Sequence, residues 1–418
     1  MTTDSRNDSP DRIFFALRGD NYDGHLFVKN ALDSGCINAV IDNPDFAIPG
    51  KTILVEDVLL SLQQLACYHR QQFTIPVLAI TGSNGKTTTK ELINLVLSGR
   101  YKTLATRGNL NNHIGVPLTL LELNSSHEFA VIEMGANHIG EIMALCHIAM
   151  PDHGLITNIG SAHLEGFGSP EGVFKAKSEL FRYLKDNGGK VFLNSSQLNL
   201  KNLVRELEII HVTYGSSDNS DVSGVLLKSE ETVNMIVNIR RSGQTIDLKT
   251  GLTGTYNFDN ILSAVCVGIF FGVPSGHIKS SIENYQPENN RSQIFHTSSN
   301  KLLLDAYNAN PDSMQAAIKN FSLMPGNNKS VILGDMLELG TYAGYEHQKI
   351  VDILISQEYE NVFLIGELFC ETVTPDSYFR FKDVDKLTAW LQSNPLRDGF
   401  ILLKGSRGLR LEKCVSAL

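Results

Sequence analysis

Short apolar runs alternate with amphipathic helical segments along most of this chain. In the middle of the sequence the strand-like runs are PVLAI, FAVIEM and HGLITNIG, and the helix-like segments are KELINLVLS and EGVFKAKSELFRYLKD. Nearer the C-terminus the strand-like runs are KLLLDAY, KSVILGD, NVFLIG and GFILLKG. Such alternation is typical of parallel sheets whose faces are covered by helices. The sequence therefore predicts an α/β fold with two sheets of this kind.

The composition excludes several other classes of protein. Hydrophobic residues make up 42% and charged residues 19% of the chain, as in a globular protein with an ample core. The net charge of −9 argues against a broad nucleic-acid surface, although a phosphate needs only a local cradle. The N-terminus lacks a signal-peptide pattern, and the longest apolar stretch, 261–273, is too short to span a bilayer. Six scattered cysteines fit reduced thiols, so we expect a cytoplasmic protein without membrane insertion.

One junction between a strand and a helix carries the ending of a nucleotide-binding loop. ITGSNGKTTTK, residues 80–90, contains Gly-Lys-Thr, but its first glycine lies closer to the second than in the standard loop. The following helix offers free N–H groups and a positive dipole end to a phosphate. We predict a phosphate cradle formed by Gly82, Ser83, Asn84, Gly85, Lys86, Thr87 and Thr88. A glycine-rich turn with a solvated lysine is the alternative.

Two further strands end in candidate ligands for Mg²⁺, which prefers oxygen donors. FAVIEMG places Glu133 at a strand end, where parallel sheets position ligand groups. The next strand runs into SAHLEGFG, which offers His163 and Glu165. A lone histidine is more often structural, but its place just past a strand end favours a ligand here. The guanine-binding pattern N-K-x-D does not occur in the sequence, which favours ATP.

Together these motifs resemble the Mur ligases, ATP-dependent amide ligases of peptidoglycan precursor synthesis. The resemblance begins with G-x-x-G-K-T-T, the strand-final glutamate, the histidine and an A-K-x-E helix. GNLNNHIGVPLTLL is similar to the family's N-N-x-x-G-x-P segment, and GTYNFDNILSAV is similar to its adenine-facing helix start. Within the family, DAYNANPDSM and GDMLELG are similar to the members that add D-alanyl-D-alanine to UDP-N-acetylmuramoyl-tripeptide.

The pattern and the resemblance together predict three domains in a chain too long for one. Residues 1–75 would form a small α/β N-terminal domain that binds the UDP-sugar. Residues 76–287 would form a central P-loop ATPase-like domain with a mostly parallel sheet, extended by a hairpin around Ser242 and Gly243. Residues 288–418 would form a C-terminal Rossmann-like α/β domain that closes on ATP and binds D-alanyl-D-alanine. We expect a monomer with hinges near 75 and 287.

The family mechanism implies roles for residues of the central domain, with ATP and two Mg²⁺ ions. Lys86 would reach the ATP phosphates and Thr87 would bind one Mg²⁺. Glu133 and His163 would bind the second, together with Lys177 if its amine is carbamylated; by pattern alone Lys177 is a solvated helix lysine. Lys86, His163 and Lys177 are the implied catalytic residues. The tripeptide carboxylate would become an acyl phosphate, from which the amine of D-alanyl-D-alanine displaces phosphate.

The resemblance also implies contacts with the nucleotides and the acceptor. The remaining ATP contacts would be Asn257, Asn260, Arg291 and Asp305. The uridine contacts would be Ser5, Arg6, Asp23, Gly24 and His25, and Asn111 and Asn112 would hold the sugar-nucleotide near the metals. Asn308 and Asn310 would face the substrate, and Asp335 fits the acceptor side of the cleft. Asn257 could instead be a helix N-cap, and Asn310-Pro311 suits an N-cap and first helical residue. Lys404, Ser406 and Arg407 form either a basic turn in the cleft or a solvated corner.

Two other classes of function stay open at this level. A related ligase would add one amino acid to the dipeptide precursor, or glutamate to folate. The block before Pro76 argues against a folate ligase, and N-A-N-P and G-D-M-L-E-L-G argue against the single-amino-acid ligases. An ATP-driven switch would not need the cluster of Glu133, His163 and Lys177. The third residue of the tripeptide, lysine or diaminopimelate, is undetermined.

Overall fold

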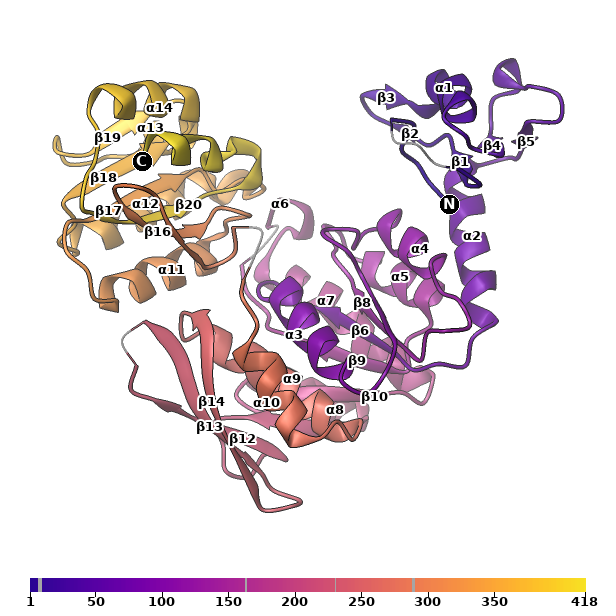
Figure 1. Ribbon diagram of the computed structural model, residues 1–418, viewed down its shortest axis with the longest axis horizontal. Coiled ribbons are helices and arrows are strands. Elements are labelled where there is room, and N and C mark those ends of the chain that lie inside the picture. The colour runs from indigo at the N-terminus through magenta and orange to yellow at the C-terminus, as the bar shows by residue number, and fades with distance from the viewer. Residues whose placement is uncertain (7–9, 162–163, 230, 288–289) are drawn as a thin grey trace.

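The computed structural model describes residues 1–6, 10–161, 164–229, 231–287 and 290–418. Its strands form sheets of three, nine and six strands and one two-stranded ribbon. We call the parts built on the three sheets the first lobe, the central lobe and the third lobe, in chain order. Figure 1 shows the first and third lobes on opposite sides of the central one. The prediction of an α/β fold is confirmed.

The first lobe has a small parallel sheet in the order β1-β4-β5. Its strands are β1 (Ile13–Phe15), β4 (Asn38–Ile41) and β5 (Thr52–Leu54), and the ribbon pairs β2 (Arg18–Gly19) with β3 (Tyr22–Asp23). Its helices are η1 (Gly24–Phe27), α1 (Val28–Asp33) and η2 (Pro44–Phe46). Phe14, Ala31 and Ile41 meet in its core. The chain leaves α1 through Gly35, whose φ of 97° suits glycine.

Helix α2 (Val58–Gln71) leads from the first lobe into the central one. The Asp57 side chain begins it by accepting the N–H of Leu60 at 2.7 Å. Near its end, the buried Arg70 guanidinium donates to four backbone carbonyls. Two of them lie just after the helix, and two lie in the central lobe. These belong to Phe73 (2.5 Å), Ile75 (3.3 Å), Ala149 (3.1 Å) and Met150 (3.4 Å). Helix α2 also packs on α4 (Gly115–Leu120) and α5 (Glu141–Ala149), beside which it lies in Figure 1.

The central sheet has the order β14-β13-β12-β11-β10-β9-β6-β8-β7. Its strands are β6 (Val77–Thr81), β7 (Thr103–Ala105), β8 (Phe129–Glu133), β9 (His153–Ile156), β10 (Lys190–Asn194), β11 (Ile210–Gly215), β12 (Val222–Leu227), β13 (Thr232–Ile239) and β14 (Gln244–Thr253). Neighbours from β7 to β12 are parallel, and β12 to β14 are antiparallel. The predicted hairpin turns at Gly243, where φ is 68°. The central sheet is therefore mostly parallel, with an antiparallel extension.

Helices cover both faces of this sheet because successive residues of its strands point to opposite sides. Leu78 and Ile80 face one core, which includes Leu92 and Ile261. Its helices are α3 (Lys86–Leu97), α9 (Asn257–Phe270) and α10 (Ser275–Glu283). Ala79 faces the other core, which is covered by α4 and α5 with α6 (Leu164–Phe167), α7 (Pro170–Asp186) and α8 (Leu198–Leu207).

The third sheet has the order β15-β16-β20-β17-β18-β19 and is parallel except for β15. Its strands are β15 (Gln293–His296), β16 (Lys301–Asp305), β17 (Lys329–Gly334), β18 (Asn361–Ile365), β19 (Phe379–Phe381) and β20 (Phe400–Lys404). The helical segments are α11 (Pro311–Leu323), η3 (Gly340–Tyr342), α12 (Ala343–Ile355), α13 (Glu367–Cys370), α14 (Val384–Ser393), η4 (Arg407–Leu409) and η5 (Leu411–Ala417). The four strands expected here are present. Among the described helices, none combines the length and apolarity that crossing a membrane requires.

Candidate active site

The loop after β6 turns at two glycines in positive-φ conformations. The angle φ is 142° at Gly82 and 79° at Gly85, and such values disfavour side chains. A Cβ at Gly82 would overlap the Thr157 hydroxyl, and one at Gly85 would lie 2.6 Å from the Asn260 amide oxygen. Ile80, where a standard loop has its first glycine, lies buried inside β6. The loop is therefore a compact one that starts after the strand.

The segment that follows β9 holds this loop in place. The N–H of Ser83 donates to the carbonyl of Asn158 at 3.0 Å, and the N–H of Asn84 donates to the Asn158 side chain at 3.0 Å. The Thr157 hydroxyl donates to the carbonyl of Asn84 at 2.6 Å. Sequence reasoning missed Thr157 and Asn158 as loop supports. The available signal was their position directly past a buried strand of the same sheet.

Lys86 begins α3 and lies back across the loop. Its ammonium donates to the carbonyl oxygens of Gly82 at 2.6 Å and Ser83 at 3.1 Å. Burial lowers the pKa of Lys86; the Glu133 carboxylate opposes this shift, and the Arg291 guanidinium adds to it. Two cations from different lobes thus repel each other. An anion such as a phosphate would relieve their repulsion.

Glu133, at the end of β8, carries a buried carboxylate beside this loop. Its Oε1 accepts hydrogen bonds from the Thr87 hydroxyl at 3.2 Å and from the Asn111 amide at 2.8 Å. Its Oε2 is buried and has no hydrogen-bond partner among the described residues. An unpaired buried carboxylate oxygen is costly. Carboxylate and hydroxyl oxygens are donors that Mg²⁺ prefers, so this pair fits a divalent cation.

Lys177 lies inside helix α7 and is only 1% exposed, so the interpretation as a solvated lysine is wrong. Its ammonium donates to the carbonyl of Ala136 at 3.3 Å and lies 5.1 Å from the centre of the Phe167 ring. Burial lowers its pKa to about 7, and the Lys86 cation adds to this effect against Glu141 and Glu179. A substantial fraction of this amine is therefore uncharged near neutral pH.

The remaining metal-ligand prediction, His163, lies outside the described residues, as does Ala162. Within the described ranges, no cluster of three or more His, Cys, Asp and Glu side chains could hold a metal. The predicted ligands would not form such a cluster, because Thr87 would bind through a hydroxyl group and Lys177 would bind only after carbamylation. The roles of all four residues stay predictions.

Asn257 and Asn260 fix the start of α9 against the nucleotide loop. The Asn260 side chain accepts from the Thr89 hydroxyl at 3.0 Å and donates to the Asn257 side chain at 2.8 Å. Asn257 in turn donates to the carbonyl of Thr253 at 2.7 Å. Tyr256 occupies the N-cap position and no side chain caps this helix, so the N-cap interpretation of Asn257 is wrong. Contact with adenine stays a prediction for both residues.

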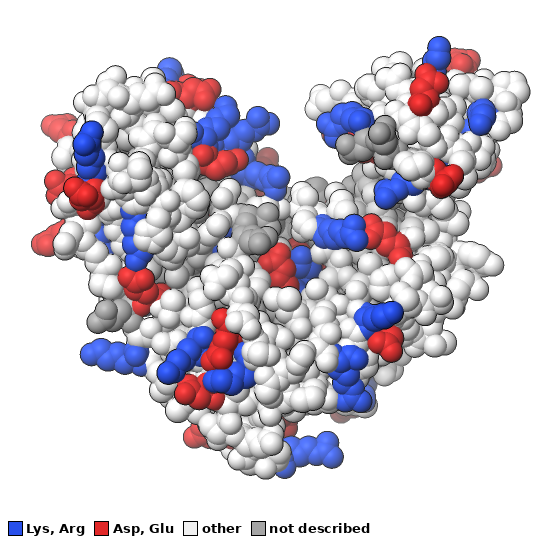
Figure 2. Space-filling model, viewed as in Figure 1, with Lys and Arg blue, Asp and Glu red and all other residues white. Residues whose placement is uncertain are grey.

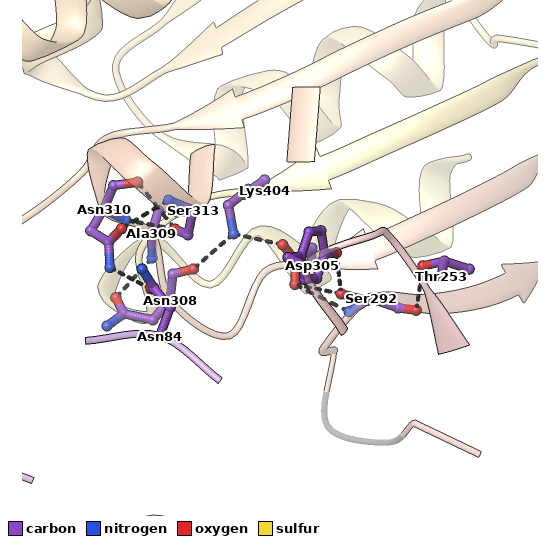
Figure 3. A network of polar contacts seen from close by, with 10 residues as sticks. Asn84, Thr253, Ser292, Asp305, Asn308, Ala309, Asn310, Ser313 and Lys404 are labelled. Carbon is purple, nitrogen blue, oxygen red and sulfur yellow. Dashed lines mark hydrogen bonds and ion pairs between the residues drawn. The ribbon is translucent and has the colours of Figure 1, made fainter. Parts of the chain in front are cut away.

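The third lobe contacts the nucleotide loop through Asn310, as Figure 3 shows. Its side-chain oxygen accepts the N–H of Ser313 at 2.9 Å, and the Ser313 hydroxyl accepts the N–H of Asn310 at 3.1 Å. This capping box at α11 confirms the N-cap prediction, with Pro311 in the first turn. The Asn310 amide also donates to the Asn84 side chain at 2.8 Å. One residue therefore begins a helix and bridges two lobes.

The Lys404 ammonium and polar groups of the third lobe gather around Asp305 in the same view (Figure 3). The Lys404 ammonium lies 2.6 Å from one Asp305 oxygen and 3.3 Å from the Asn308 carbonyl, and the N–H of Ser292 donates to the other Asp305 oxygen at 3.1 Å. The Asn308 side chain accepts the N–H of Ala309 at 2.9 Å. Lys404 and Ser406 are buried, so a solvated corner is wrong for them.

Two arginine side chains lie over the ring of Tyr307, which follows Asp305 closely in the chain. The Arg291 guanidinium lies 3.6 Å from the centre of the Tyr307 ring, and that of Arg407 lies 5.0 Å from it. Stacking on an aromatic ring orients a guanidinium without using its N–H donors. Sequence reasoning missed Tyr307, and a pattern alone could not reveal that one ring serves two arginines distant in sequence.

Asp335 follows β17 and is buried within the third lobe. Its two carboxylate oxygens accept the N–H groups of Leu368 at 3.0 Å and Phe369 at 2.9 Å, at the start of α13. A Cβ on Gly366 would overlap this carboxylate, so the glycine permits the close approach. The geometry thus gives Asp335 a structural role, and its contact with the acceptor stays a prediction.

In the first lobe, Asp23, Gly24 and His25 form one turn. The Asp23 carboxylate accepts the N–H of His25 at 2.9 Å and lies 2.6 Å from its Nδ1, while the N–H of Asp42 donates to its Nε2 at 3.2 Å. A cavity of about 290 Å³ lies beside His25. Arg6 pairs with Asp4 at 2.9 Å at the surface, next to Ser5. No uridine contact is established by this arrangement.

Asn111 and Asn112 lie in the segment between β7 and α4. Asn111 contacts Glu133 as described, whereas the Asn112 side chain accepts the N–H groups of Ile114 at 3.1 Å and Gly115 at 2.9 Å. Asn112 thus shapes the start of α4, and Asn111 alone reaches the candidate metal site. Of the predicted residues, the structure brings together those of the loop with Glu133, Asn111, Asn260 and Asn310.

Family models of two domains match most of the chain. The Mur ligase middle domain matches residues 80–268, and the Mur ligase, glutamate ligase domain matches residues 290–407. A curated relative, UDP-N-acetylmuramoyl-tripeptide–D-alanyl-D-alanine ligase of Bacillus subtilis (strain 168), is 33% identical over 430 residues. That alignment covers 100% of this chain and 92% of the relative.

Solved structures give the same result. MurF from Acinetobacter baumannii has a TM-score of 0.88 at 30% identity, covering 99% of this chain and 92% of that one. MurF ligase from Thermotoga maritima, in complex with ADP, has a TM-score of 0.85 at 26% identity, covering 100% of this chain and 96% of that one. The resemblance drawn from the motifs is confirmed. With two domain models matched and a relative aligned along the full length of this chain, the chain belongs to the Mur ligase family.

Proposed function

We propose that this chain is the ATP-dependent ligase that joins D-alanyl-D-alanine to UDP-N-acetylmuramoyl-tripeptide in peptidoglycan precursor synthesis, forming ADP and phosphate. The observation that carries this assignment is the hydrogen bond between Asn310 and Asn84. It brings DAYNANPDSM, the motif similar to the D-alanyl-D-alanine-adding ligases, onto the nucleotide loop. The full-length relative that bears this activity in its name supports the same assignment.

The chemistry accounts for the charges in the site. A carboxylate is a poor acylating agent, so its oxygen first attacks the γ-phosphorus of ATP and ADP leaves. The amine of D-alanyl-D-alanine then attacks the acyl carbon, phosphate leaves, and the amine loses a proton as the amide forms. Both reactants of the first step are anionic, and Lys86 and Arg291 offset their repulsion. The rest is positioning on the loop held by Asn158.

Mg²⁺ is part of this proposal. Thr87 would hold one ion, and Glu133, His163 and a carbamylated Lys177 would hold a second. When bound, the ions neutralise phosphate charge and favour ADP as a leaving group. The buried, unpartnered Oε2 of Glu133 supports a cation here.

The carbamate at Lys177 follows from its environment. The uncharged amine attacks CO₂, forms an N–C bond and releases one proton, which leaves a carboxylate on the lysine. A pKa of about 7 makes the reactive uncharged form available near neutral pH. The product also places an anion where the protonated amine would be repelled by the Lys86 cation.

We further propose a cytoplasmic monomer whose first lobe binds the UDP-sugar and whose third lobe binds the acceptor. The six cysteines are all free in the structure, which supports a reducing compartment. The nucleotide loop is reached by Asn310 of the same chain, so its contact with the third lobe needs no second copy. Size-exclusion chromatography with light scattering tests the monomer; a stable dimer at micromolar concentration would contradict it.

Phosphate release tests the activity directly. The purified protein is mixed with ATP, Mg²⁺, UDP-N-acetylmuramoyl-tripeptide and D-alanyl-D-alanine, and phosphate is followed with time. We expect release only when both the tripeptide and the dipeptide are present. Release with a single amino acid but not with D-alanyl-D-alanine would overturn the assignment.

Lys86→Ala is the matched test of the nucleotide loop. It removes the cation that reaches the phosphates, and we expect turnover to be abolished. Lys29→Ala, on α1 of the first lobe, changes a lysine far from this loop and serves to check protein quality by circular dichroism. Turnover at the wild-type rate in Lys86→Ala would show that the loop does not hold the reacting phosphates.

A further inference from the structure

The ring of Tyr307 brings together two arginines that are distant in the sequence. Arg291 comes just before β15, Tyr307 just after β16, and Arg407 just after β20. The centre of the Tyr307 ring lies 3.6 Å from the Arg291 guanidinium and 5.0 Å from that of Arg407. These strands are neighbours in the third sheet, so the three residues meet at the edge where its parallel strands end. This edge is where α/β sheets bind ligands.

The charges of both arginines are available to a ligand. Within the described ranges, neither guanidinium pairs with a carboxylate or donates a hydrogen bond. Lys404, in the same turn as Arg407, differs, because its ammonium lies 2.6 Å from an Asp305 oxygen. Two unpaired cations held over one ring repel each other, and anions that bind them relieve this repulsion.

Arg291 acts on the nucleotide loop of the central lobe. Besides burial, the Arg291 cation lowers the pKa of the Lys86 ammonium, which begins α3. In the proposed reaction the ATP phosphates lie at Lys86. The anion for Arg291 is therefore a phosphate of ATP.

Arg407 lies where the two motifs of the third lobe meet. Tyr307 belongs to DAYNANPDSM, and Ser406 joins the Arg407 turn to GDMLELG. The N–H of Ser406 donates to the carbonyl of Asp335 at 3.1 Å, and its hydroxyl accepts the N–H of Leu337 at 2.9 Å. Both motifs are similar to the ligases that add D-alanyl-D-alanine. That dipeptide ends in a free carboxylate, which a planar guanidinium can bind through two parallel N–H donors.

We propose that Tyr307 is a positioning residue that holds Arg407 for the carboxylate of D-alanyl-D-alanine and Arg291 for the phosphates of ATP. The inference rests on the proposed function. Arg407 then distinguishes the dipeptide acid from a dipeptide whose carboxylate is blocked. Because one ring supports both guanidiniums, it also sets the acceptor carboxylate and the nucleotide at fixed positions relative to each other. Loss of the ring therefore weakens the binding of both substrates.

The first experiment compares two acceptors. Phosphate release with ATP and UDP-N-acetylmuramoyl-tripeptide gives kcat/KM for D-alanyl-D-alanine and for D-alanyl-D-alaninamide, which lacks the carboxylate. We expect the native enzyme to prefer the acid by about tenfold or more, as a charge-assisted pair allows. In Arg407→Gln this preference falls to about one, while the KM for ATP stays within about twofold of the native value.

The second experiment removes the ring. Tyr307→Leu releases both arginines, so we expect KM to rise by about threefold or more for ATP and for D-alanyl-D-alanine. Tyr307→Phe keeps the ring and is expected to have native KM values, a rescue that separates positioning from a general loss of structure. Adding Arg407→Gln to Tyr307→Leu raises the KM for the dipeptide less than Arg407→Gln does alone. Thermal unfolding checks each variant, and Tyr307→Gln replaces Tyr307→Leu if the latter does not fold.

Arg380→Gln is the matched control. Arg380 is exposed on β19, at the far edge of the same sheet, and donates to the carbonyl of Cys370 at 3.3 Å, so its loss leaves both KM values native.

The outcomes separate the two proposals. Failure of the native enzyme to release phosphate with either acceptor overturns the proposed function. Equal use of the two acceptors by the native enzyme, or an unchanged preference in Arg407→Gln, overturns the role of Arg407. Native KM values in Tyr307→Leu, or equally raised KM values in Tyr307→Phe, overturn the role of the ring.

Discussion

At the scale of single residues, two buried ionisable groups distinguish this site from an ordinary phosphate-binding turn. Glu133 keeps one oxygen without a hydrogen-bond partner among the described residues, and Lys177 keeps a buried amine beside another lysine. Burying such groups costs free energy unless a partner compensates them. The proposed carbamate, with the cations that it would bind, would relieve both costs.

Lys177→Ala tests the carbamate. We expect this variant to be inactive, because the ligand to the second Mg²⁺ is removed, and to recover part of its turnover in the presence of acetate. Acetate supplies a short carboxylate in the space left by the side chain. Phosphate release at increasing acetate measures the recovery, with Lys185→Ala near the end of the same helix as the control. Full activity of Lys177→Ala without acetate would contradict the carbamate.

The amine of Lys177 also predicts how stability changes with pH in CO₂-free buffer. Its pKa is about 7 in the folded chain and 10.5 in the reference state, so between these values the unfolded chain binds more protons. The free energy of unfolding therefore rises with pH in this window, by up to about 1.4 kcal/mol per unit. Lys177→Met lacks this titrating amine. The free energy of unfolding of the variant, relative to that of the native protein, therefore decreases from pH ~7 to pH ~9. Urea titrations measure it; a constant difference would contradict the lowered pKa.

The sequence predicted residues of this site whose positions follow from local pattern. Gly82, Lys86 and Glu133 stand at a strand end or helix start, and such positions can be predicted from the sequence without knowledge of the fold. The burial of Lys177 was not predictable, because Ala136 and Phe167, which cover it, come from other elements. Long-range packing decides whether a helix lysine is solvated, and a single sequence does not contain it.

At the scale of elements, the start of α11 combines two tasks in Asn310. The side-chain oxygen caps the helix, and the amide nitrogen reaches Asn84 of the nucleotide loop. The sequence predicted the cap from Asn310-Pro311, because capping is a local matter. The sequence did not predict the hydrogen bond from Asn310 to Asn84, because this bond joins residues of different lobes.

Substitutions at Asn310 separate these two tasks. Asn310→Ser keeps a good N-cap, so we expect near-native thermal stability, but it loses the amide donor and with it much of kcat/KM. Asn310→Ala loses both, with a further cost of about 1 kcal/mol. Asp383→Ala removes a comparable cap from α14, where Asp383 accepts the N–H of Lys386 at 2.8 Å, and is expected to cost stability alone. Native kcat/KM in Asn310→Ser would show that the bridge is dispensable.

At the scale of the whole molecule, the first and third lobes are separated by a notch above the central lobe. Figure 2 shows Lys and Arg side chains on both flanks of this notch. The net charge of the chain is −9, so these cations are a local feature and not the general character of the surface. They suit substrates that carry phosphates and carboxylates and that extend from one lobe to another.

Closure of this notch is a measurable expectation. With a non-hydrolysable ATP analogue and UDP-N-acetylmuramoyl-tripeptide together, we expect the radius of gyration to fall, because the substrate spans the lobes. Small-angle X-ray scattering measures it, with D-alanyl-D-alanine alone as the control. An unchanged radius at saturating concentrations of both ligands would contradict hinge motion.

The four carbonyl contacts of Arg70 determine where such a motion can take place. They join the end of α2 to Phe73 and Ile75 just after it and to Ala149 and Met150 at the end of α5, so this end of α2 is fixed to the central lobe. The start of α2 packs on the first lobe, where Val58 and Leu62 are buried beside Phe15 and Val40. Helix α2 is thus a rigid support that is packed on the first lobe at one end and on the central lobe at the other. A rotation of the first lobe about this support would move the nucleotide end of the bound precursor, while the reacting carboxylate would stay at the central lobe.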